Sequence, residues 1–412
     1  MNTAASVAEV VNNGLCIGCG LCESVTEQRV TMRTNTAGSL RPFPLDGFSP
    51  AEEATILASC PGTNATVRSD LDDVAVDDIW GRVSDMAYAW AGNPDVRFEA
   101  ATGGVLTALG MHVLESGQAA FVLHVGADPE QPMRSRWVIS ENPEQVRANT
   151  GSWYGPTAPL AGLETALGRG EPFAIIAKPC DLGAVHLHSA NDPRIDELVV
   201  ARLTMVCGGQ SRFEKSTDVI DELDLNEEEV SLFRYRGYGN PGATRIETFD
   251  GRSFELTYNE MWDDEAGWKT ESRCTLCPDA LGECSDVAAA DAWPGGGPTG
   301  EDEGFNGIMV RTTQGQALVQ SAVESGALVV GEKITAREYD DLQPHQVRKK
   351  IALDSRNEAL TAAGKPTIST TGLRIKKLAG QQSADERAAV LSGTAKRIAD
   401  GRYDTEDDAA SN

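Results

Sequence analysis

The chain has 412 residues, 41% of them hydrophobic, which is enough for one large domain or about two to three smaller ones. Its formal net charge of -26 disfavours binding to nucleic acid or to an anionic membrane surface, because both attract basic proteins. No apolar stretch is long enough to span a bilayer, and the first residues lack the basic and apolar regions of a secretory signal. A cytoplasmic location, without a membrane or nucleic-acid partner, is therefore expected.

Three closely spaced cysteines stand near the start of the chain. Cys16, Cys19 and Cys22 form a C-x2-C-x2-C run, and Cys60 follows downstream before a proline. This is the ligand pattern of a bacterial ferredoxin-type 4Fe–4S cluster, in which each iron takes one thiolate. Zinc motifs usually contain two cysteine pairs instead of a triplet, and nine grouped cysteines argue against a disulfide framework. Residues 1–68 are therefore predicted to form a ferredoxin-like 4Fe–4S domain.

The next stretch, residues 69–78, contains five aspartates and is typical of a polar linker. Beyond it, apolar runs alternate with helical patterns. This alternation predicts a largely parallel sheet covered on both faces, within an α/β domain over residues 79–345. The strands are expected at residues 119–125, 173–177 and 198–206, and the helices at residues 104–116, 158–167 and 213–223.

Four more cysteines lie in this α/β section: Cys180, Cys207, Cys274 and Cys277. Cys180 follows one predicted strand and Cys207 follows the next, so both should lie at the carboxyl edge of the sheet, where ligands bind. Cys274 and Cys277 add a C-x2-C pair, and the four make a candidate ligand set for a second 4Fe–4S cluster. Two alternatives stay open. Cys180 and Cys207 could be ordinary core residues, and Cys284 could replace one of the ligands.

A β-hairpin is predicted over residues 245–257, as an addition to the α/β domain. Its turn is expected at Asp250 and Gly251, because an Asp-Gly pair between alternating residues favours a tight hairpin turn.

The last part of the chain, residues 346–412, is charged and is predicted to form a helical extension. Its acidic end, from residue 403 onward, is expected to be a disordered tail. Near its start, Lys349 and Lys350 contribute with His345 and Arg348 to a local basic spot, for which a solvated helix face is the favoured interpretation.

Thr102, Gly103 and Gly104 stand where the helix over residues 104–116 should begin. Glycines allow close backbone approach, and a helix N-terminus favours a pyrophosphate. On these residues alone, a glycine-capped helix start is the simpler interpretation.

Lys178, Asp181 and His186 lie close to Cys180 in the sequence and are the candidate catalytic residues. Lys178 would place a positive charge at the end of a strand, with a solvated lysine as the alternative. Asp181 or His186 would supply a proton during a two-electron reduction, although packing or surface roles are the favoured interpretation for both.

Several segments together resemble the beta subunit of the coenzyme F420 (deazaflavin) hydrogenase/dehydrogenase family, and most of all its branch with 7-hydroxymethyl chlorophyll a reductase and divinyl chlorophyllide reductase. They are residues 103–109, 151–154, 178–181, 233–242, 257–260 and 274–294. The resemblance implies FAD and one or two 4Fe–4S clusters. Carried onto this sequence, it implies flavin contacts from Thr102, Gly103, Gly104, Gly151, Ser152, Tyr154, Lys178 and Asn259.

These observations predict an FAD- and 4Fe–4S-dependent oxidoreductase. Reduced ferredoxin, or a similar carrier, would pass single electrons through two 4Fe–4S clusters to FAD, which would reduce a small organic substrate by two electrons. The alternative is an electron-transfer beta subunit that oxidises or reduces a deazaflavin within a larger hydrogenase or dehydrogenase complex. A zinc-stabilised binding module is a third interpretation. The sequence leaves open the substrate and whether the chain forms a homo-oligomer.

Overall fold

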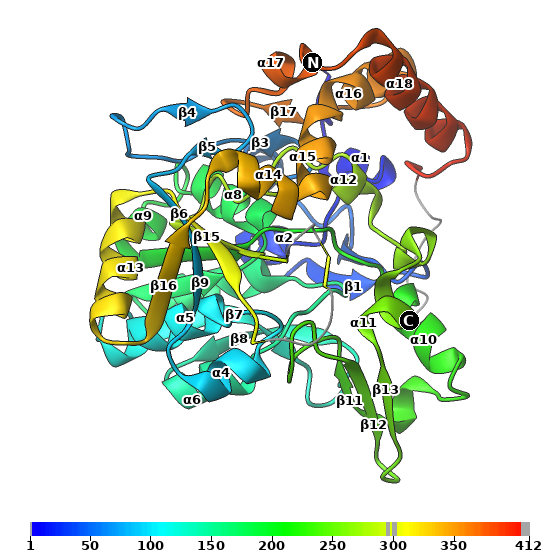
Figure 1. Ribbon diagram of the computed structural model, residues 1–412. Helices are drawn as coiled ribbons and strands as arrows, with labels where there is room; N and C mark the ends of the chain where they lie inside the picture. The colour runs from blue at the N-terminus through cyan, green and yellow to red at the C-terminus, as the bar shows by residue number, and fades with distance from the viewer. Residues whose placement is uncertain (1, 294–296, 299–302, 405–412) are drawn as a thin grey trace.

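The computed structural model describes residues 2–293, 297–298 and 303–404, arranged around one large sheet (Figure 1). The sheet has eight strands. In spatial order they are β16 (Leu328–Lys333), β6 (Asp85–Ala91), β15 (Asn306–Val310), β14 (Val287–Asp291), β10 (Val199–Met205), β9 (Phe173–Ile176), β7 (Phe121–Ala127) and β8 (Ser135–Ser140).

The four middle strands, β14, β10, β9 and β7, are parallel to one another. The strands on both sides of this group pair antiparallel with their neighbours. The predicted parallel sheet is therefore confirmed for its centre, and the three predicted strands are β7, β9 and β10. These strands can be predicted because they are continuous apolar runs. In β9, for example, Phe173, Ala174 and Ile175 are all fully buried, as expected of a parallel strand covered on both faces.

Helices cover the two faces of the sheet. On one face, α5 (Val105–Glu115) and α13 (Thr313–Glu324) pack against Ala174 and Leu203. On the other, α7 (Leu163–Gly168), α8 (Pro179–His188) and α9 (Arg194–Leu198) pack against Phe173 and Ile175. Neighbouring residues of β9 thus face opposite layers, as the period of a strand requires.

The predicted helices over residues 104–116 and 213–223 are confirmed as α5 and α10 (Glu214–Asp221). The one over 158–167 begins as a short 3-10 turn, η1 (Pro159–Gly162), and continues as α7. Two short helices, α4 (Pro94–Glu99) and α6 (Pro143–Ala148), complete this half of the molecule.

The predicted hairpin is confirmed as β12 (Thr244–Thr248) and β13 (Ser253–Leu256), with a positive φ of 89° at Gly251 in the turn. A third strand, β11 (Val230–Arg234), pairs with β12, which the sequence did not predict. This small antiparallel sheet is followed by α11 (Tyr258–Trp262) and projects from the main body (green, lower right in Figure 1).

The N-terminal segment contains α1 (Val7–Asn12), α2 (Leu21–Val25), β1 (Thr31–Thr34), β2 (Leu40–Phe43) and α3 (Pro50–Ser59). The C-terminal extension is helical, as predicted, with α14 (Ala336–Leu342), α15 (Pro344–Ile351), α16 (Leu353–Ala362), α17 (Ile375–Ala379) and α18 (Ala384–Ala399).

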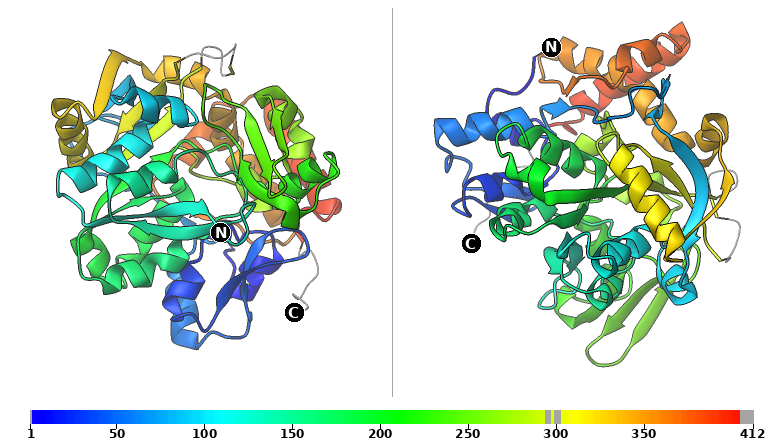
Figure 2. Two further views of the ribbon diagram at one scale, coloured as in Figure 1. Left: turned by 90° about the horizontal axis from the view of Figure 1, so that it is seen from below. Right: turned by 90° about the vertical axis from the view of Figure 1, so that its left-hand side faces the viewer.

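Part of the N-terminal segment packs beside the C-terminal extension (Figure 2). β3 (Asn64–Ala65) pairs in parallel with β17 (Ser369–Thr370), and Leu15, Leu276 and Leu353 share one core. The predicted boundaries at residues 68, 79 and 345 stay predictions.

The linker over residues 69–78 is mostly without regular structure, apart from β4 (Val76–Asp77), which pairs with β5 (Gly81–Arg82). The predicted disordered tail begins too early, because Tyr403 is 1% exposed and its hydroxyl bonds that of Thr275 at 2.9 Å. The rest of that prediction, residues 405–412, lies outside the described residues. Within the described part of the chain, every helix is too short or too polar to cross a bilayer.

Candidate functional site

The first four candidate ligands come together beside α2 and α3. Cys16 and Cys19 precede α2, Cys22 lies within it, and Cys60 ends α3. Burial raises the pKa of Cys22 well above its ordinary value, and the neighbouring thiols of Cys60, Cys19 and Cys16 raise it further. Burial likewise raises the pKa of Cys60 to about 11. The four thiols are therefore close enough to interact, with Cys19 buried and the other three half-buried.

Backbone N–H groups point at these sulfurs. The N–H of Gly62 donates to Cys60 Sγ at 3.3 Å, and backbone groups at Gly18 and Leu21 lower the pKa of Cys16 and Cys19 against the effect of burial. Hydrogen bonds of this kind stabilise thiolates that hold a cluster and tune its potential. The donor set and its surroundings fit a 4Fe–4S cluster.

Gly20 fixes the course of the chain between the cysteines. Its φ is 91°, and a Cβ there would lie 2.5 Å from the nitrogen of Ala161. We expect Gly20→Ala to lower the free energy of unfolding by at least about 1–2 kcal/mol from the backbone conformation alone, with the clash adding to this. Urea unfolding measures the change, with Gly168→Ala as the control.

Gly168 is the matched position, because it has no positive φ and an added Cβ would meet nothing within 4 Å. Equal stabilities for the two variants would contradict the role of Gly20.

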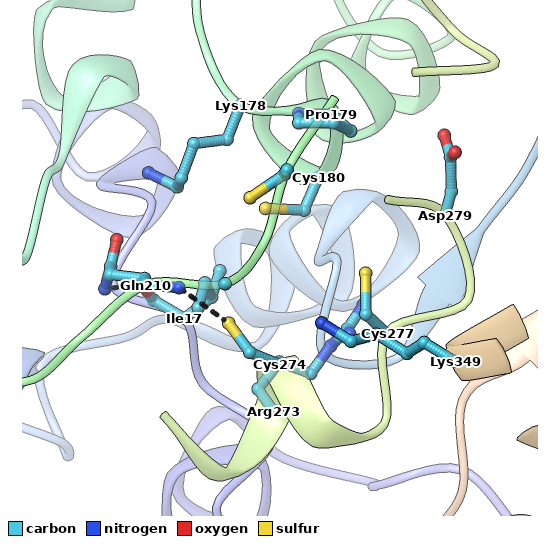
Figure 3. Close-up of a pocket in the computed structure, with 12 residues that line it drawn as sticks. Ile17, Lys178, Pro179, Cys180, Gln210, Arg273, Cys274, Cys277, Asp279 and Lys349 are labelled. Atoms are coloured by element: carbon cyan, nitrogen blue, oxygen red, sulfur yellow. Dashed lines mark hydrogen bonds between the residues drawn. The ribbon is translucent and has the colours of Figure 1, made fainter. Parts of the chain in front are cut away.

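The second set of four cysteines lines one pocket (Figure 3). Cys180 begins α8 just after β9, and Cys207 follows β10, so the carboxyl edge of the sheet brings them together as the sequence predicts. Cys274 in α12 (Ser272–Thr275) and the nearby Cys277 approach from another direction. Burial raises the pKa of Cys274 to about 12, and the thiols of Cys207 and Cys277 contribute.

All nine cysteines are free thiols. Within the described residues, no group of three or more His, Cys, Asp or Glu side chains is arranged to hold a metal ion. A 4Fe–4S cluster has a different requirement, since it takes one thiolate on each of four separate irons.

Cys284 is not part of the second set. It is 1% exposed, and its thiol donates to the carbonyl oxygen of Thr66 at 3.2 Å. It is absent from the lining of the pocket that holds the other four. The geometry therefore favours Cys180, Cys207, Cys274 and Cys277 over any set that includes Cys284.

Of the three candidate catalytic residues, Lys178 lines this pocket and Asp181 is paired with it. The Lys178 ammonium is 3.0 Å from the Asp181 carboxylate and donates to Thr157, so it is not the solvated lysine of the alternative interpretation. Burial would lower the pKa of Lys178, but the charge of Asp181 and the thiol of Cys180 raise it. His186 lies elsewhere, beside Arg68, Arg202 and Asp196, and burial lowers its pKa. The structure thus separates His186 from the pocket.

Gln210 connects the two cysteine sets. Its backbone N–H donates to Cys274 Sγ at 3.3 Å, and its side-chain amide donates to the carbonyl of Ile17, between Cys16 and Cys19, at 3.1 Å. Gln210 is 2% exposed, so both contacts are shielded from solvent.

Arg273 makes a second connection. This residue precedes Cys274, and its guanidinium donates to the carbonyl of Pro61, next to Cys60, at 2.9 and 2.6 Å.

The candidate flavin residues gather around a buried arginine, Arg236. Its guanidinium donates to the hydroxyl of Tyr154 at 3.0 Å, to the carboxylate of Asp291 at 2.9 Å and to the carbonyl of Ala101. Thr102 bonds the same aspartate. Gly104 stands at the N-cap of α5 with a φ of 75°, and it has no side chain that could cap the helix.

Gly103 and Gly151 also lie in this region. A Cβ at Gly103 would be 2.9 Å from the Ala89 carbonyl, and one at Gly151 would be 3.2 Å from the Arg236 carbonyl. Ser152 is half-buried between these residues, and Asn259 is exposed on α11. Among the candidate flavin residues, Lys178 lies away from Arg236, because it lines the pocket of the second cysteine set.

Aromatic side chains pack beside Tyr154. Its ring centroid is 4.5 Å from that of Trp262, and the rings of Trp293 and Tyr258, which contact each other, both pack against the Arg236 guanidinium. The indole N–H groups of Trp153 and Trp262 are buried and have no hydrogen-bond partner within the described part of the chain. Neighbouring aromatic rings and N–H donors without a partner suit a planar group with polar edges, such as the ring system of a flavin.

Sequence reasoning did not assign individual roles to the residues that organise the site. Arg236 lies in the segment over residues 234–242, for which a pocket-shaping role and a structured loop were both open, and Asp291 was given no role. Gln210 gives no signal, because its contacts are to residues far away in the chain. The basic spot was interpreted wrongly, since Lys349 and Lys350 are only 7% and 2% exposed.

Comparison with known proteins agrees with this architecture. Residues 86–164 match the N-terminal model, and residues 170–335 the C-terminal model, of the coenzyme F420 hydrogenase/dehydrogenase beta subunit. The chain is 21% identical over 276 residues to the coenzyme F420 hydrogenase subunit beta of Methanococcus voltae, covering 64% of this chain and 88% of that protein.

It is also 24% identical over 252 residues to the F420-dependent formate dehydrogenase 1 subunit beta of Methanococcus maripaludis, covering 59% of this chain and 60% of that longer protein. Among solved structures, it matches a chain of the F420-reducing NiFe hydrogenase complex from Methanosarcina barkeri with a TM-score of 0.56 and 18% identity, over 71% of this chain and 98% of that chain. Since the two family models together match more than half of its residues, the chain belongs to the coenzyme F420 hydrogenase/dehydrogenase beta-subunit family.

Proposed function

We propose that this chain is an iron–sulfur flavoprotein that exchanges electrons with a deazaflavin, as the beta subunit of a larger oxidoreductase complex. Its relatives include the beta subunits of a coenzyme F420 hydrogenase and of an F420-dependent formate dehydrogenase. The two cysteine sets would hold two 4Fe–4S clusters, and the region around Arg236 would hold FAD.

The observation that carries this proposal is one short segment that contacts all three regions. Gln210 bonds the sulfur of Cys274 and the carbonyl of Ile17, and the N–H of Ser211 donates to the carbonyl of Tyr154 at 2.9 Å. Both cysteine sets and the candidate flavin region are therefore linked through neighbouring residues of one loop. When bound, clusters carry single electrons and a flavin carries two, so their adjacency suits an electron relay.

The chain's own residues would give each cofactor its surroundings. N–H groups such as that of Gly62 would offset the charge on sulfur. Arg236 would hold Tyr154, Asp291 and the carbonyl of Ala101 in fixed positions beside the flavin. Lys178, fixed by Asp181, would add a positive charge next to the second cluster.

A second candidate is a self-contained reductase, in which reduced ferredoxin supplies electrons and the flavin reduces a small organic substrate. It is favoured by the position of the first cysteine set, which lies before residue 86 and so outside both family models. The resemblance to the chlorophyll reductase branch also favours a self-contained reductase. A chain with its own ferredoxin-like segment does not need another subunit to deliver electrons.

Anaerobic reduction of the bound flavin separates the two candidates. We expect chemically reduced coenzyme F420 to bleach the flavin absorption, and to do so even in Cys22→Ser, because a deazaflavin passes both electrons directly to a flavin. Co-purification with a catalytic subunit would add support. Bleaching by reduced ferredoxin alone, lost in Cys22→Ser, would contradict the main proposal and favour the second candidate. No bleaching by either donor would contradict both.

A further inference from the structure

Lys349, on α15, enters the pocket of the second cysteine set (Figure 3). The sequence favours a solvated helix face for this residue, but its side chain is 7% exposed. Its ammonium donates to the carbonyl of Gly208, directly after Cys207, at 2.7 Å. Residue 349 lies beyond the end of the C-terminal family model, so this contact belongs to the extension of this chain.

The other cations near the pocket have their charges or donors engaged elsewhere. Lys178 is paired with Asp181 at 3.0 Å, and Lys350 is paired with Glu283. Arg273 points toward Pro61, on the side of the first set. In contrast, no carboxylate forms an ion pair with Lys349 in the part of the chain that the structure describes.

Lys349 lines the same pocket as all four candidate ligands, and its ammonium bonds the carbonyl directly after Cys207. The ammonium group therefore lies near enough to stabilise negative charge on this set. Reduction adds one negative charge to a cluster, and in a buried site an unpaired cation stabilises that charge more strongly than it would in water.

We propose that Lys349 is a positioning residue that sets the reduction potential of the cluster held by Cys180, Cys207, Cys274 and Cys277. Its charge raises that potential, so that electrons arriving at the first cluster move on to the second. This inference rests on the proposed function, because it requires the second cluster to be present. It assigns a redox role to the C-terminal extension, which otherwise contributes only packing.

The test is an anaerobic redox titration followed by electron paramagnetic resonance. Lys349→Gln removes the charge but keeps a donor for Gly208, Lys349→Arg keeps the charge, and Lys376→Met removes an exposed charge on α17 as the control. In Lys349→Gln, one of two reduction waves is expected to move to lower potential. At the wild-type midpoint potential, the ratio of reduced to oxidised cluster should fall at least about tenfold. For a one-electron couple this corresponds to a midpoint potential lower by about 59 mV.

The other wave, and both waves in Lys349→Arg and Lys376→Met, should stay in place. Unmoved waves in Lys349→Gln with full iron content would overturn the inference. Loss of about four irons from Lys349→Gln but not from Lys349→Arg would support a role of the charge, whereas loss from both would show that Lys349 only packs. Wild-type protein with about four irons, and a single wave that stays in place in Lys349→Gln, would overturn the second cluster and this inference, while the deazaflavin exchange keeps its own test by flavin bleaching.

Discussion

Cys274→Ser is expected to halve the iron and sulfide content of anaerobically purified protein, from about eight to about four of each per chain. Cys274 lines the pocket with Cys180, Cys207 and Cys277, and its sulfur accepts the backbone N–H of Gln210 at 3.3 Å. A 4Fe–4S cluster needs a thiolate on each iron, and a buried serine hydroxyl is a poor substitute. Iron and acid-labile sulfide assays per chain measure the loss.

Cys284→Ser is the matched control. Cys284 is as buried as Cys274, but its thiol donates to the Thr66 carbonyl, a contact that a serine hydroxyl can also make. This variant should keep about eight irons. Iron loss in Cys284→Ser together with full iron in Cys274→Ser would show that the second ligand set is assigned wrongly.

Glu283→Ala is expected to give the largest loss of stability, about 3–5 kcal/mol in the free energy of unfolding. Glu283 and Lys350 form an ion pair in which both side chains are 2% exposed, and Arg374 donates to the same carboxylate at 2.7 Å. Removing the carboxylate leaves two cations in the protein interior without their ion-pair partner. Urea unfolding at neutral pH measures the change.

Two further variants test this explanation. Glu283→Ala combined with Lys350→Met should recover part of the loss, because an apolar pair replaces a broken ion pair at little cost. Glu229→Ala breaks a surface ion pair with Arg252 and should have a far smaller effect. A loss in the double variant as large as in Glu283→Ala would contradict an electrostatic origin.

The same ion pair predicts how stability depends on pH. Burial would raise the pKa of Glu283, but Lys350 and Arg374 hold it below its ordinary value. Its contribution is therefore fully present above the unfolded pKa of about 4.3, and it is lost as the pH falls through the lower folded pKa. The stability difference between wild type and Glu283→Ala should shrink only below about pH 4. A difference that already disappears near pH 6 would contradict this assignment.

The sequence predicts those parts of the fold whose signal is local. β7, β9 and β10 are apolar runs with polar ends, and from their order alone Cys180 and Cys207 were expected to meet at the sheet edge. β14 was not predicted, because Val-Ala-Ala-Ala-Asp has low strand propensity and its burial depends on the strands beside it.

The missed site residues depend on contacts between distant segments. Arg236 bonds Ala101, Tyr154 and Asp291, and no spacing in the sequence indicates that these residues meet. The burial of Lys349 depends on how α15 packs against the loop after β10. A charged helix has the same pattern whether its lysines face water or a pocket, so charge alone predicts exposure.

The most direct test of the electron-relay proposal is the amount of iron, acid-labile sulfide and flavin in protein purified without oxygen. The account predicts about eight irons, eight sulfides and one flavin per chain, from two 4Fe–4S clusters and one FAD. About four irons would show that one cysteine set, first of all Cys180, Cys207, Cys274 and Cys277, does not hold a cluster. Zinc in place of iron and sulfide, with no flavin, would contradict the account altogether.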